Sequence, residues 1–126
     1  MTDFLAFGNL TLDDVVTAAG QASLEQLGGS SVYAAAGVRL WGESISLISI
    51  VGSDFPEESL AELAEGGIDI SGVERIDIPH GLRSRAFYFP DGSRTDNPDE
   101  APIPLPPDVQ DLLISKKRYT DYGSRK

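Results

Sequence analysis

The sequence of 126 residues contains no cysteine, one histidine and one tryptophan. The absence of cysteine excludes disulfides, a thiolate nucleophile and any cysteine-based metal site. Its longest apolar stretch is far shorter than the ~20 residues that a membrane-spanning helix needs. The first residues also lack the basic region and long apolar run of a secretion signal. We therefore expect a cytoplasmic protein.

Basic residues are scarce, since ten lysines and arginines stand against 20 acidic residues and give a formal net charge of -10. A net negative field repels phosphate, so we expect neither nucleic acid nor a membrane as a partner. The last segment, residues 116–126, reverses this balance with five basic residues and one acidic residue. We therefore distinguish a body over residues 1–115 from a basic tail over residues 116–126.

Several widespread catalytic motifs are missing. The sequence has no phosphate-binding Gly-x-x-x-x-Gly-Lys-Ser/Thr loop, no Gly-x-Gly-x-x-Gly and no Gly-x-Ser-x-Gly. Its single histidine, His80, stands between Pro79 and Gly81, a context more typical of a turn than of a catalytic base. The acidic residues show no metal-ligand spacing, so we expect no metal site in this chain.

What the sequence does contain is an alternation of strand and helix patterns. Apolar runs predict strands over residues 4–8 and 45–51, the second covered on both faces. An alanine-rich helix over residues 32–41 follows a serine N-cap, and a second helix is capped by Asp54 and stopped by Gly66-Gly67. This order predicts a parallel sheet with right-handed crossovers.

Hairpin patterns flank this alternation. Apolar and polar residues alternate over residues 10–18 and 22–27, which predicts one hairpin, although the second segment also suits a helical turn. Residues 73–78 and 84–89 predict another pair of strands. Prolines dominate from Asn97 onward, and residues 108–114 are expected to begin a short helix. The hairpins do not fit the parallel sheet, so they predict a separate small sheet.

Two short features contain groups that could bind a ligand. Asp13-Asp14 interrupts an apolar strand segment, and a carboxylate there can accept hydrogen bonds from sugar hydroxyls. Gly28-Gly29 precedes a helix, where glycines let a ligand approach backbone N–H groups. Each feature alone favours a simpler interpretation, namely an exposed edge strand protected by acids and a helix with a tight start.

Taken in order, these segments resemble the N-terminal part of the ribokinase-like, or PfkB-type, carbohydrate kinases. The first match is Gly8-Asn-Leu-Thr-Leu-Asp13, followed by Gly28-Gly29 and the helix that ends before Gly42. The string that ends in Gly52-Ser-Asp54 is close to the family's Gly-x-Asp, and residues 82–92 look like a strand of the family's lid with its tip. The resemblance covers about residues 4–108.

The resemblance implies an α/β fold, with a partial parallel sheet, flanking helices and a small β-sheet lid. It assigns residues 4–9 and 29–72 to the core, and residues 11–27 and 73–96 to the lid. The full family domain is longer, so only its first part is expected in this chain.

The resemblance also implies substrate-binding residues. Asp13 matches the aspartate that holds sugar hydroxyls, and Gly28 and Gly29 match the glycine pair beside the sugar at the lid hinge. Tyr33 occupies the region where the family often has an asparagine, which predicts a differently shaped pocket. Packing of Tyr33 on the lid is an equally good interpretation.

Three arginines fall on the predicted lid hairpin, namely Arg83, Arg85 and Arg94. Substrate contacts are one interpretation of these side chains. Charged side chains on a short solvated hairpin more often increase solubility, and lysine and arginine keep their charged ends in water. We therefore expect all three to be exposed.

The family's catalytic motif is absent, since Gly-Ala-Gly-Asp, which supplies its anion hole and base, does not occur in this sequence. The family's magnesium-linked Asn-x-x-Glu lies later in the domain, and the bare pattern occurs here once, as Asn97-Pro-Asp-Glu100 in the proline-rich stretch. The resemblance therefore implies an ATP-dependent carbohydrate or nucleoside kinase that is truncated before its catalytic half and inactive alone, with no catalytic, cofactor-binding or metal residue of its own. The alternative is a non-catalytic sugar-binding module, or a module that forms a homodimer through its lid sheet.

Overall fold

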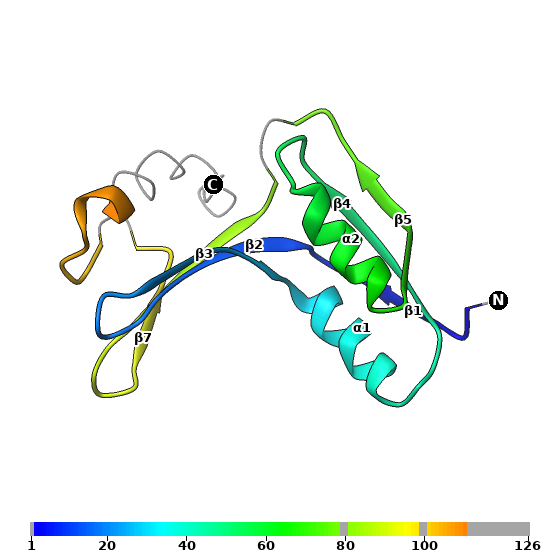
Figure 1. Ribbon diagram of the computed structural model, residues 1–126, viewed down its shortest axis with the longest axis horizontal. Helices are drawn as coiled ribbons and strands as arrows, with labels where there is room; N and C mark the ends of the chain where they lie inside the picture. Colours follow the sequence, from blue (N-terminus) through cyan, green and yellow to red (C-terminus); the bar gives the residue numbers. More distant parts are fainter. Residues whose placement is uncertain (1, 79–80, 99–100, 111–126) are drawn as a thin grey trace, which may run out of the picture. The chain divides into compact units, whose positions relative to one another are not determined.

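The computed structural model describes residues 2–78, 81–98 and 101–110 (Figure 1). The predicted turn at His80 and the basic tail over residues 116–126 lie outside the described residues, as does most of the helix expected over residues 108–114. The chain divides into two compact units. The first unit contains residues 1–11 and 27–82, and the second contains residues 12–26 and those from 83 onward.

The first unit is built on a three-stranded parallel sheet, as the sequence predicts. Its strands are β1 (Phe4–Phe7), β4 (Ile45–Val51) and β5 (Ile68–Arg75), in the order β1-β4-β5. The register aligns Ala6 of β1 with Leu47 of β4. Both side chains are buried, because alternate residues of neighbouring strands share one face of a sheet.

Helix α1 (Ser30–Leu40) begins differently from the prediction. Its N-cap is Gly29, and no side chain caps it. The Ser31 hydroxyl instead donates a hydrogen bond of 2.8 Å to the carbonyl of Asn9. Because this serine lies inside the first turn and turns toward the loop after β1, it ties the helix to the sheet rather than capping it.

Helix α2 (Glu57–Glu65) has Pro56 as its N-cap, so the predicted capping by Asp54 is wrong. The Asp54 carboxylate accepts a hydrogen bond from the backbone N–H of Gly81 at 3.2 Å. Two glutamates in the first turn of α2 stand at the positive end of the helix dipole. The helix ends at Gly66, as the sequence predicts.

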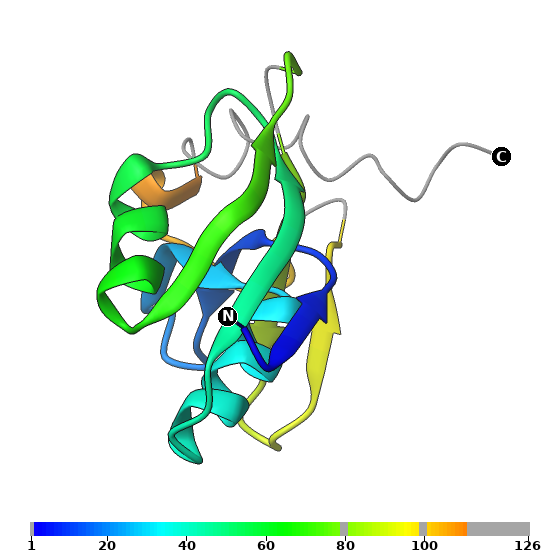
Figure 2. The same cartoon turned by 90° about the vertical axis from the view of Figure 1, so that its right-hand side faces the viewer.

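The core of the first unit lies on the face of the sheet that the two helices cover. Figure 2 shows β1, β4 and β5 toward the viewer with both helices behind them. The buried apolar side chains of the unit are Ala6, Leu10, Ala35, Ile45, Leu47, Val51, Phe55, Leu63 and Ile68. The predicted coverage of residues 45–51 on both faces is wrong, because Ile50 of β4 is 58% exposed.

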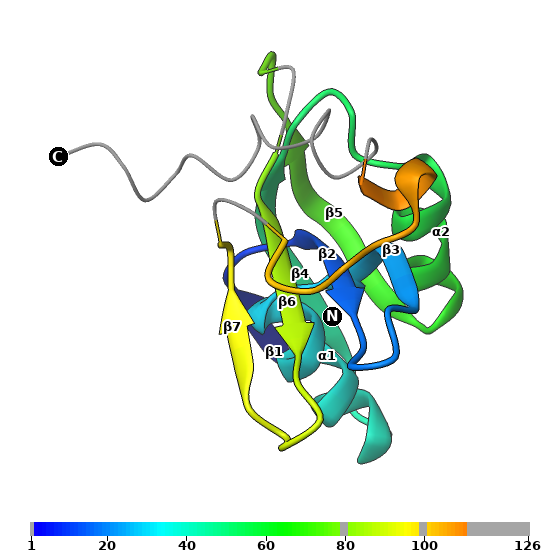
Figure 3. The same ribbon diagram turned by 90° about the vertical axis from the view of Figure 1, so that its left-hand side faces the viewer.

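The second unit contains a four-stranded sheet (Figure 3). Its strands are β2 (Thr11–Val16), β3 (Ala22–Gly28), β6 (Arg83–Tyr88) and β7 (Arg94–Asp96), in the order β3-β2-β6-β7. Strand β2 pairs with β6 in parallel, and β6 pairs with β7 in antiparallel fashion. The predicted first hairpin and the separate small sheet are confirmed.

Residues 73–78, assigned to the lid from the sequence, differ in the structure. Val73 belongs to β5 and pairs with Ser49 of β4 in the parallel sheet. Strand β5 continues this far because Gly72 lets the strands approach, since a Cβ there would lie 2.8 Å from the Leu47 carbonyl oxygen. The hairpin partner of β6 is the short strand β7, reached through a turn with Gly92 at a φ of 84°.

The proline-rich segment covers one face of the second sheet. Val16 and Phe87 are buried there, and the side chains packed against them are Ala22, Leu24, Ile103, Leu105 and Val109. Figure 3 shows the segment that follows residue 101 crossing in front of the sheet. This packing gives the second unit a small core of its own.

No helix in the described part of the chain is both long enough and apolar enough to cross a membrane.

Candidate functional site

Asp13 lies on a central strand, because β2 stands between β3 and β6. The interpretation as a protected edge strand is therefore wrong. Burial alternates along β2, with Leu12 and Asp14 buried on one face and Asp13 partly exposed on the other. Asp13 is in register with Ser84 of β6, which is also partly exposed. The two polar side chains thus share the less covered face of the second sheet.

Gly28 and Gly29 occupy the junction between β3 and α1. Gly29 has a φ of 108°, and a Cβ there would lie 2.0 Å from the carbonyl oxygen of Asn9. Gly8 is also crowded, since its Cβ would lie 2.7 Å from the hydroxyl of Ser30. The loop after β1 therefore touches the start of α1 so closely that only glycine fits at position 29.

This contact lies at the carboxyl end of the parallel sheet, where ligands of open α/β sheets generally bind. The loop after β1 is held there by a hydrogen bond of 3.2 Å from the Leu10 backbone N–H to the Ser49 hydroxyl. The first-turn N–H groups of α1 have no side-chain cap and stand at the positive end of the helix dipole. They can donate hydrogen bonds to hydroxyl or anionic oxygens.

The Gly52-Ser-Asp54 loop after β4 is fixed by Arg75. The guanidinium Nη1 donates to the carbonyls of Gly52 at 2.9 Å, Ser53 at 3.3 Å and Phe55 at 2.9 Å. Its Nη2 forms an ion pair with Glu57 at the start of α2. Because three backbone carbonyls of the loop accept hydrogen bonds from the same planar guanidinium, the loop has a defined conformation.

The four predicted substrate-binding residues divide between the two units. Asp13 belongs to the second unit, and Gly28, Gly29 and Tyr33 belong to the first. Tyr33 lies on α1 and is 69% exposed. Gly28 and Gly29 are brought against the loop after β1, whereas the convergence of Asp13 and Tyr33 on one ligand stays a prediction.

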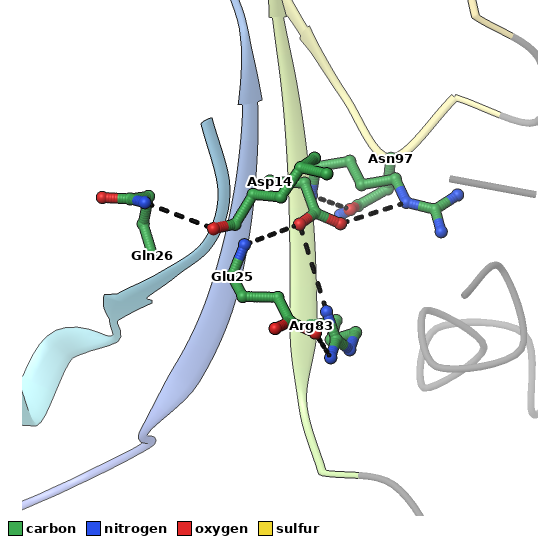
Figure 4. A network of polar contacts seen from close by, with 7 residues as sticks. Asp14, Glu25, Gln26, Arg83 and Asn97 are labelled. Atoms are coloured by element: carbon green, nitrogen blue, oxygen red, sulfur yellow. Dashed lines mark hydrogen bonds and ion pairs between the residues drawn. The ribbon is translucent and has the colours of Figure 1, made fainter. Parts of the chain in front are cut away.

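The sequence analysis missed a buried ion cluster in the second sheet, which we define as Asp14, Glu25, Arg83 and Arg85 (Figure 4). Asp14 Oδ1 lies 4.0 Å from Arg83 Nη1, and its Oδ2 lies 3.8 Å from Arg85 Nε. Arg83 Nη2 donates to Glu25 Oε1 at 2.8 Å. Asp14, Arg83 and Arg85 are nearly fully buried, so the expectation of exposed arginines is wrong for positions 83 and 85.

Arg94 is exposed, as expected from the sequence. Its side chain is 52% exposed and pairs with Asp96 at 3.1 Å. The hydrogen bond that Arg94 donates to the Tyr88 hydroxyl, together with the nearby Asp96, raises the pKa of Arg94. By contrast, burial lowers the pKa of Arg85 from its ordinary value, while Asp14 opposes that shift. The difference follows from position, because β7 is an edge strand and β6 is central.

Two unusual backbone conformations occur next to residues of the ion cluster. Glu25 has a φ of 56°, and its backbone N–H donates to Asp14 Oδ1 at 2.9 Å. Asn97 has a φ of 50°, accepts a hydrogen bond from the Arg85 N–H and donates one to the Arg85 carbonyl, both at 2.8 Å. The side chains of the cluster thereby connect β3, β2 and β6, and the backbone of Arg85 connects β6 with the residue that follows β7.

A signal for this cluster exists in the sequence. Asp14 alternates with the apolar Leu12 and Val16, and Arg83 and Arg85 alternate with Phe87 in the same period of two. Opposite charges at apolar-face positions of two strands indicate a buried pair if those strands are neighbours. The sequence alone does not show that they are neighbours.

Magnesium was expected only for the longer family domain. Within the described residues, no group of three or more histidine, cysteine, aspartate or glutamate side chains is placed to hold a metal ion. The residues present therefore do not fit a metal site, and no step of a reaction is derived through one.

Solved structures with the same arrangement identify the fold. Ribokinase II of Escherichia coli superposes with a TM-score of 0.68 at 20% identity, over 76% of this chain and 33% of that one. The chain has a ribokinase-like fold. A ribokinase of Cryptococcus neoformans, solved in complex with ADP, matches with a TM-score of 0.67 at 15% identity, over 83% of this chain and 37% of that one.

A curated relative supports the ribokinase-like assignment at the level of sequence. The cytidine kinase of Thermococcus kodakarensis is 29% identical over 121 residues, which is 90% of this chain and 42% of that enzyme. No protein-family model matches the chain. The chain thus spans between about a third and two fifths of the length of these ribokinase-like kinases.

Proposed function

We propose that this chain is the substrate-binding part of an ATP-dependent kinase that phosphorylates a hydroxyl of a sugar or nucleoside. The observation that carries the proposal is Asp13, an acidic residue on the less covered face of a central strand in a ribokinase-like fold. Relatives with the same fold include a ribokinase and a cytidine kinase, whose substrates both contain a ribose. Substrates of that class fit the donor and acceptor groups of this chain.

Asp13 would orient the substrate. An ionised carboxylate accepts hydrogen bonds at both oxygens, so one aspartate can hold two neighbouring hydroxyls of a furanose ring. The N–H groups at the start of α1, which follow Gly28 and Gly29 and have no side-chain cap, would donate hydrogen bonds to substrate oxygens. Tyr33 would shape the pocket with an exposed aromatic side chain in place of the amide side chain common in the family.

Phosphoryl transfer itself would require the part of the domain that this chain does not span. Transfer depends on positioning of the nucleotide and on stabilising charge around its γ-phosphate. E. coli ribokinase II has been solved with ATP and Mg²⁺ bound, whereas the described residues of this chain offer no metal-binding cluster. We therefore propose that the chain binds substrate and does not turn it over alone.

Isothermal titration of the full chain with ribose, cytidine and inosine tests the substrate proposal. Asp13→Asn removes the charge but keeps the shape, and we expect binding at least about tenfold weaker, because a hydrogen bond to a charged group contributes about 1.5–3 kcal/mol. Asp96→Asn is the matched control, since it lies in the same sheet in an exposed pair with Arg94. Affinity that is the same in both variants would contradict the proposal.

A coupled ATP-hydrolysis assay tests the catalytic part separately. The chain with its best-binding substrate, ATP and Mg²⁺ should show no turnover above that of the substrate and nucleotide alone. Magnesium-dependent turnover would contradict the need for the rest of the domain. Absence of any sugar or nucleoside binding, combined with a dimer in light scattering, would instead favour the lid-mediated dimerisation module.

A further inference from the structure

The turn between β6 and β7 contains the one Asp-Gly pair of the sequence, Asp91-Gly92, and the sequence has no Asn-Gly pair (Figure 3). An Asp-Gly pair is chemically labile, because the backbone nitrogen that follows an aspartate can attack the carboxyl carbon of its side chain. Glycine obstructs this attack least, since it has no Cβ and its backbone rotates freely. The tip of this hairpin is therefore the point where the backbone of the chain rearranges most easily.

The surroundings of the turn leave room for that reaction. Asp91 and Gly92 are both exposed, so water reaches them. Gly92 has a φ of 84°, and a Cβ there would meet nothing within 4 Å. Ring closure requires rotation about the bonds between the two residues, and no packed side chain opposes it at this tip.

Hydrogen bonds within the turn act against the reaction. Asp91 Oδ1 accepts one from the Ser93 backbone N–H at 2.8 Å and one from the Ser93 hydroxyl at 2.6 Å. Both hold the carboxyl group in an Asx turn, and they lower the pKa of Asp91, which keeps the group ionised and its carbon a poor electrophile. All three residues of the tip, Asp91 to Ser93, are exposed, and exposed hydrogen bonds of a loop open readily. The turn therefore slows the reaction without preventing it.

We propose that Asp91-Gly92 is a site of covalent modification, at which Asp91 of the folded chain rearranges to isoaspartate, and that Ser93 slows this reaction by holding the carboxyl group. Water is the one co-reactant. The proposal concerns the tip of the hairpin alone, so it stands whether or not Asp13 binds a sugar.

The rearrangement has two steps that together leave the mass of the chain unchanged. In the first, the Gly92 nitrogen attacks Cγ of Asp91 and forms a C–N bond, and the carboxyl OH leaves with the amide hydrogen as water. The resulting five-membered ring joins both carbonyl carbons of Asp91 to the same nitrogen. In the second, water adds to the former backbone carbonyl carbon, and the bond from that carbon to nitrogen breaks. The chain then continues through Cβ and Cγ, and the former backbone carbonyl is a carboxylate.

The product lengthens the turn, because one more carbon lies between Cα of Asp91 and the Gly92 nitrogen. Two backbone hydrogen bonds span this link, from the Gly92 N–H to the Phe89 carbonyl at 3.0 Å and from the Phe89 N–H to the Ser93 carbonyl at 2.9 Å. The turn fixes the register of a hairpin, so a longer link disturbs the pairing of β6 with β7. Strand β7 is short and lies at the edge of the sheet, and we expect it to separate from β6 after modification.

Ageing of the purified full chain tests the proposal. The chain is kept for several weeks at body temperature and neutral pH and is then digested with trypsin. Cleavage after Arg85 and Arg94 gives the peptide of residues 86–94, in which Asp91 is the one acidic residue. Isoaspartate in this peptide is measured by methylation with an isoaspartyl methyltransferase and located by electron-transfer fragmentation. A synthetic peptide of the same sequence, aged in parallel, is the positive control.

Variants identify the groups that set the rate. We expect isoaspartate at Asp91 and none at Asp96, which is exposed on the same hairpin but is followed by asparagine. Gly92→Ala should lower the yield at least about tenfold, because its methyl group obstructs ring closure. Ser93→Ala should raise the rate at least about threefold, because it removes a hydrogen bond to the carboxylate. Ser23→Ala is the matched control, since this exposed serine lies on β3 at the opposite edge of the sheet.

Hydrogen exchange connects the modification with the fold. In the modified chain, the amides of residues 94–97 should exchange at least about tenfold faster than in the fresh chain, whereas those of β2 should change less than about twofold. Asp91→Glu keeps the charge but cannot form the five-membered ring, so its exchange should not change with age.

Three results would overturn the proposal. The first is an unmodified peptide 86–94 from the aged chain when the synthetic peptide does form isoaspartate. The second is an equal yield in the original chain and in Gly92→Ala. The third is a rate in Ser93→Ala no higher than in Ser23→Ala, which would remove the role assigned to Ser93. Isoaspartate confined to Asp91 and accelerated by Ser93→Ala supports the proposal even if the chain binds no sugar.

Discussion

The three-stranded sheet buries apolar side chains and a few serines, whereas the four-stranded sheet buries an aspartate and two arginines between its central strands. In the first, strand register follows from apolar alternation and from the close approach of β5 to β4 at Gly72. In the second, opposite charges on β2 and β6 face one another. One short chain thus specifies its strand pairing in two different ways, and mutations should disrupt the two sheets differently.

The largest effect is expected at Gly29, where the first unit depends on a close backbone approach. Gly29→Ala places a Cβ 2.0 Å from a backbone oxygen at a φ of 108°. The clash involves rigid backbone and adds to the cost of the left-handed conformation, so we expect about 4 kcal/mol or more of destabilisation in urea unfolding.

Gly42→Ala is the control for backbone strain without the clash. Gly42 has a φ of 77°, and a Cβ there meets nothing within 4 Å. We expect about 1 kcal/mol of destabilisation, which is the cost of the left-handed conformation alone. Equal effects at the two positions would show that strain, rather than the approach of Asn9, determines the cost at Gly29.

An effect of intermediate size is expected at the ion cluster. Asp14→Ala removes the carboxylate that lies beside the buried guanidinium groups of Arg83 and Arg85, and loss of one partner from a buried ion cluster costs about 3 kcal/mol. The urea midpoint of the full chain measures this loss. Asp96→Ala, which breaks the exposed pair with Arg94, should cost less than about 1 kcal/mol.

A triple variant makes the second sheet resemble the first. Asp14→Leu, Arg83→Met and Arg85→Met together replace the three buried charges by apolar side chains of similar length. Such replacements are often neutral or stabilising, so the triple variant should recover to within about 1 kcal/mol of the original chain. Destabilisation as large as in Asp14→Ala would show that attraction between the opposite charges stabilises the pairing of β2 with β6. Recovery of stability would show that the sheet requires only that its buried charges be balanced.

The smallest effect concerns the surface of the first sheet. The Ser46 hydroxyl and then the Ser71 backbone N–H donate to Asp69 and lower its pKa from 3.8 to about 2. A carboxyl group with a lowered pKa in the folded state stabilises the fold above its unfolded pKa, and this contribution is lost as the pH falls from 3.8 through about 2. Stability of the original chain should therefore decline slightly more in this range than that of Asp69→Asn.

The measurement is the urea midpoint as a function of pH for the two chains, together with a titration of the Asp69 carboxyl carbon by nuclear magnetic resonance. Asp69 is solvent-exposed, so the difference between the chains should be small. An Asp69 pKa at the ordinary value of 3.8 would contradict the hydrogen bond from Ser46.

Much of the fold could be predicted from local patterns. Residues 45–51 form a strand because they are apolar and β-branched, and the Gly66-Gly67 pair ends α2 because Gly67 adopts a φ of 80°, which glycine tolerates. The helix caps were predicted less well. Ser31 and Asp54 have the right chemistry for capping, yet both form hydrogen bonds to residues far along the chain instead.

The sequence indicates which residues are candidates for the site, but it indicates less about the burial and the partners of the residues around them. The order of motifs places Asp13 in a ribokinase-like pattern, and the strand alternation sets it on the opposite face from Asp14. Burial of Arg83 and Arg85 could not be predicted, because arginines are seldom buried unless they are paired. Their partners lie far away in sequence, as in the pair of Arg83 with Glu25, 58 positions apart.

The α/β class, the strand and helix segments, the two glycines before α1 and the likeness to ribokinase-like kinases depend on the order and periodicity of neighbouring residues, so they can be predicted from the sequence. The position of β2 between β3 and β6, the burial of the ion cluster and the exposed apolar face of the parallel sheet are seen only in the folded chain. Burial depends on which distant strands become neighbours, and local patterns do not specify that choice.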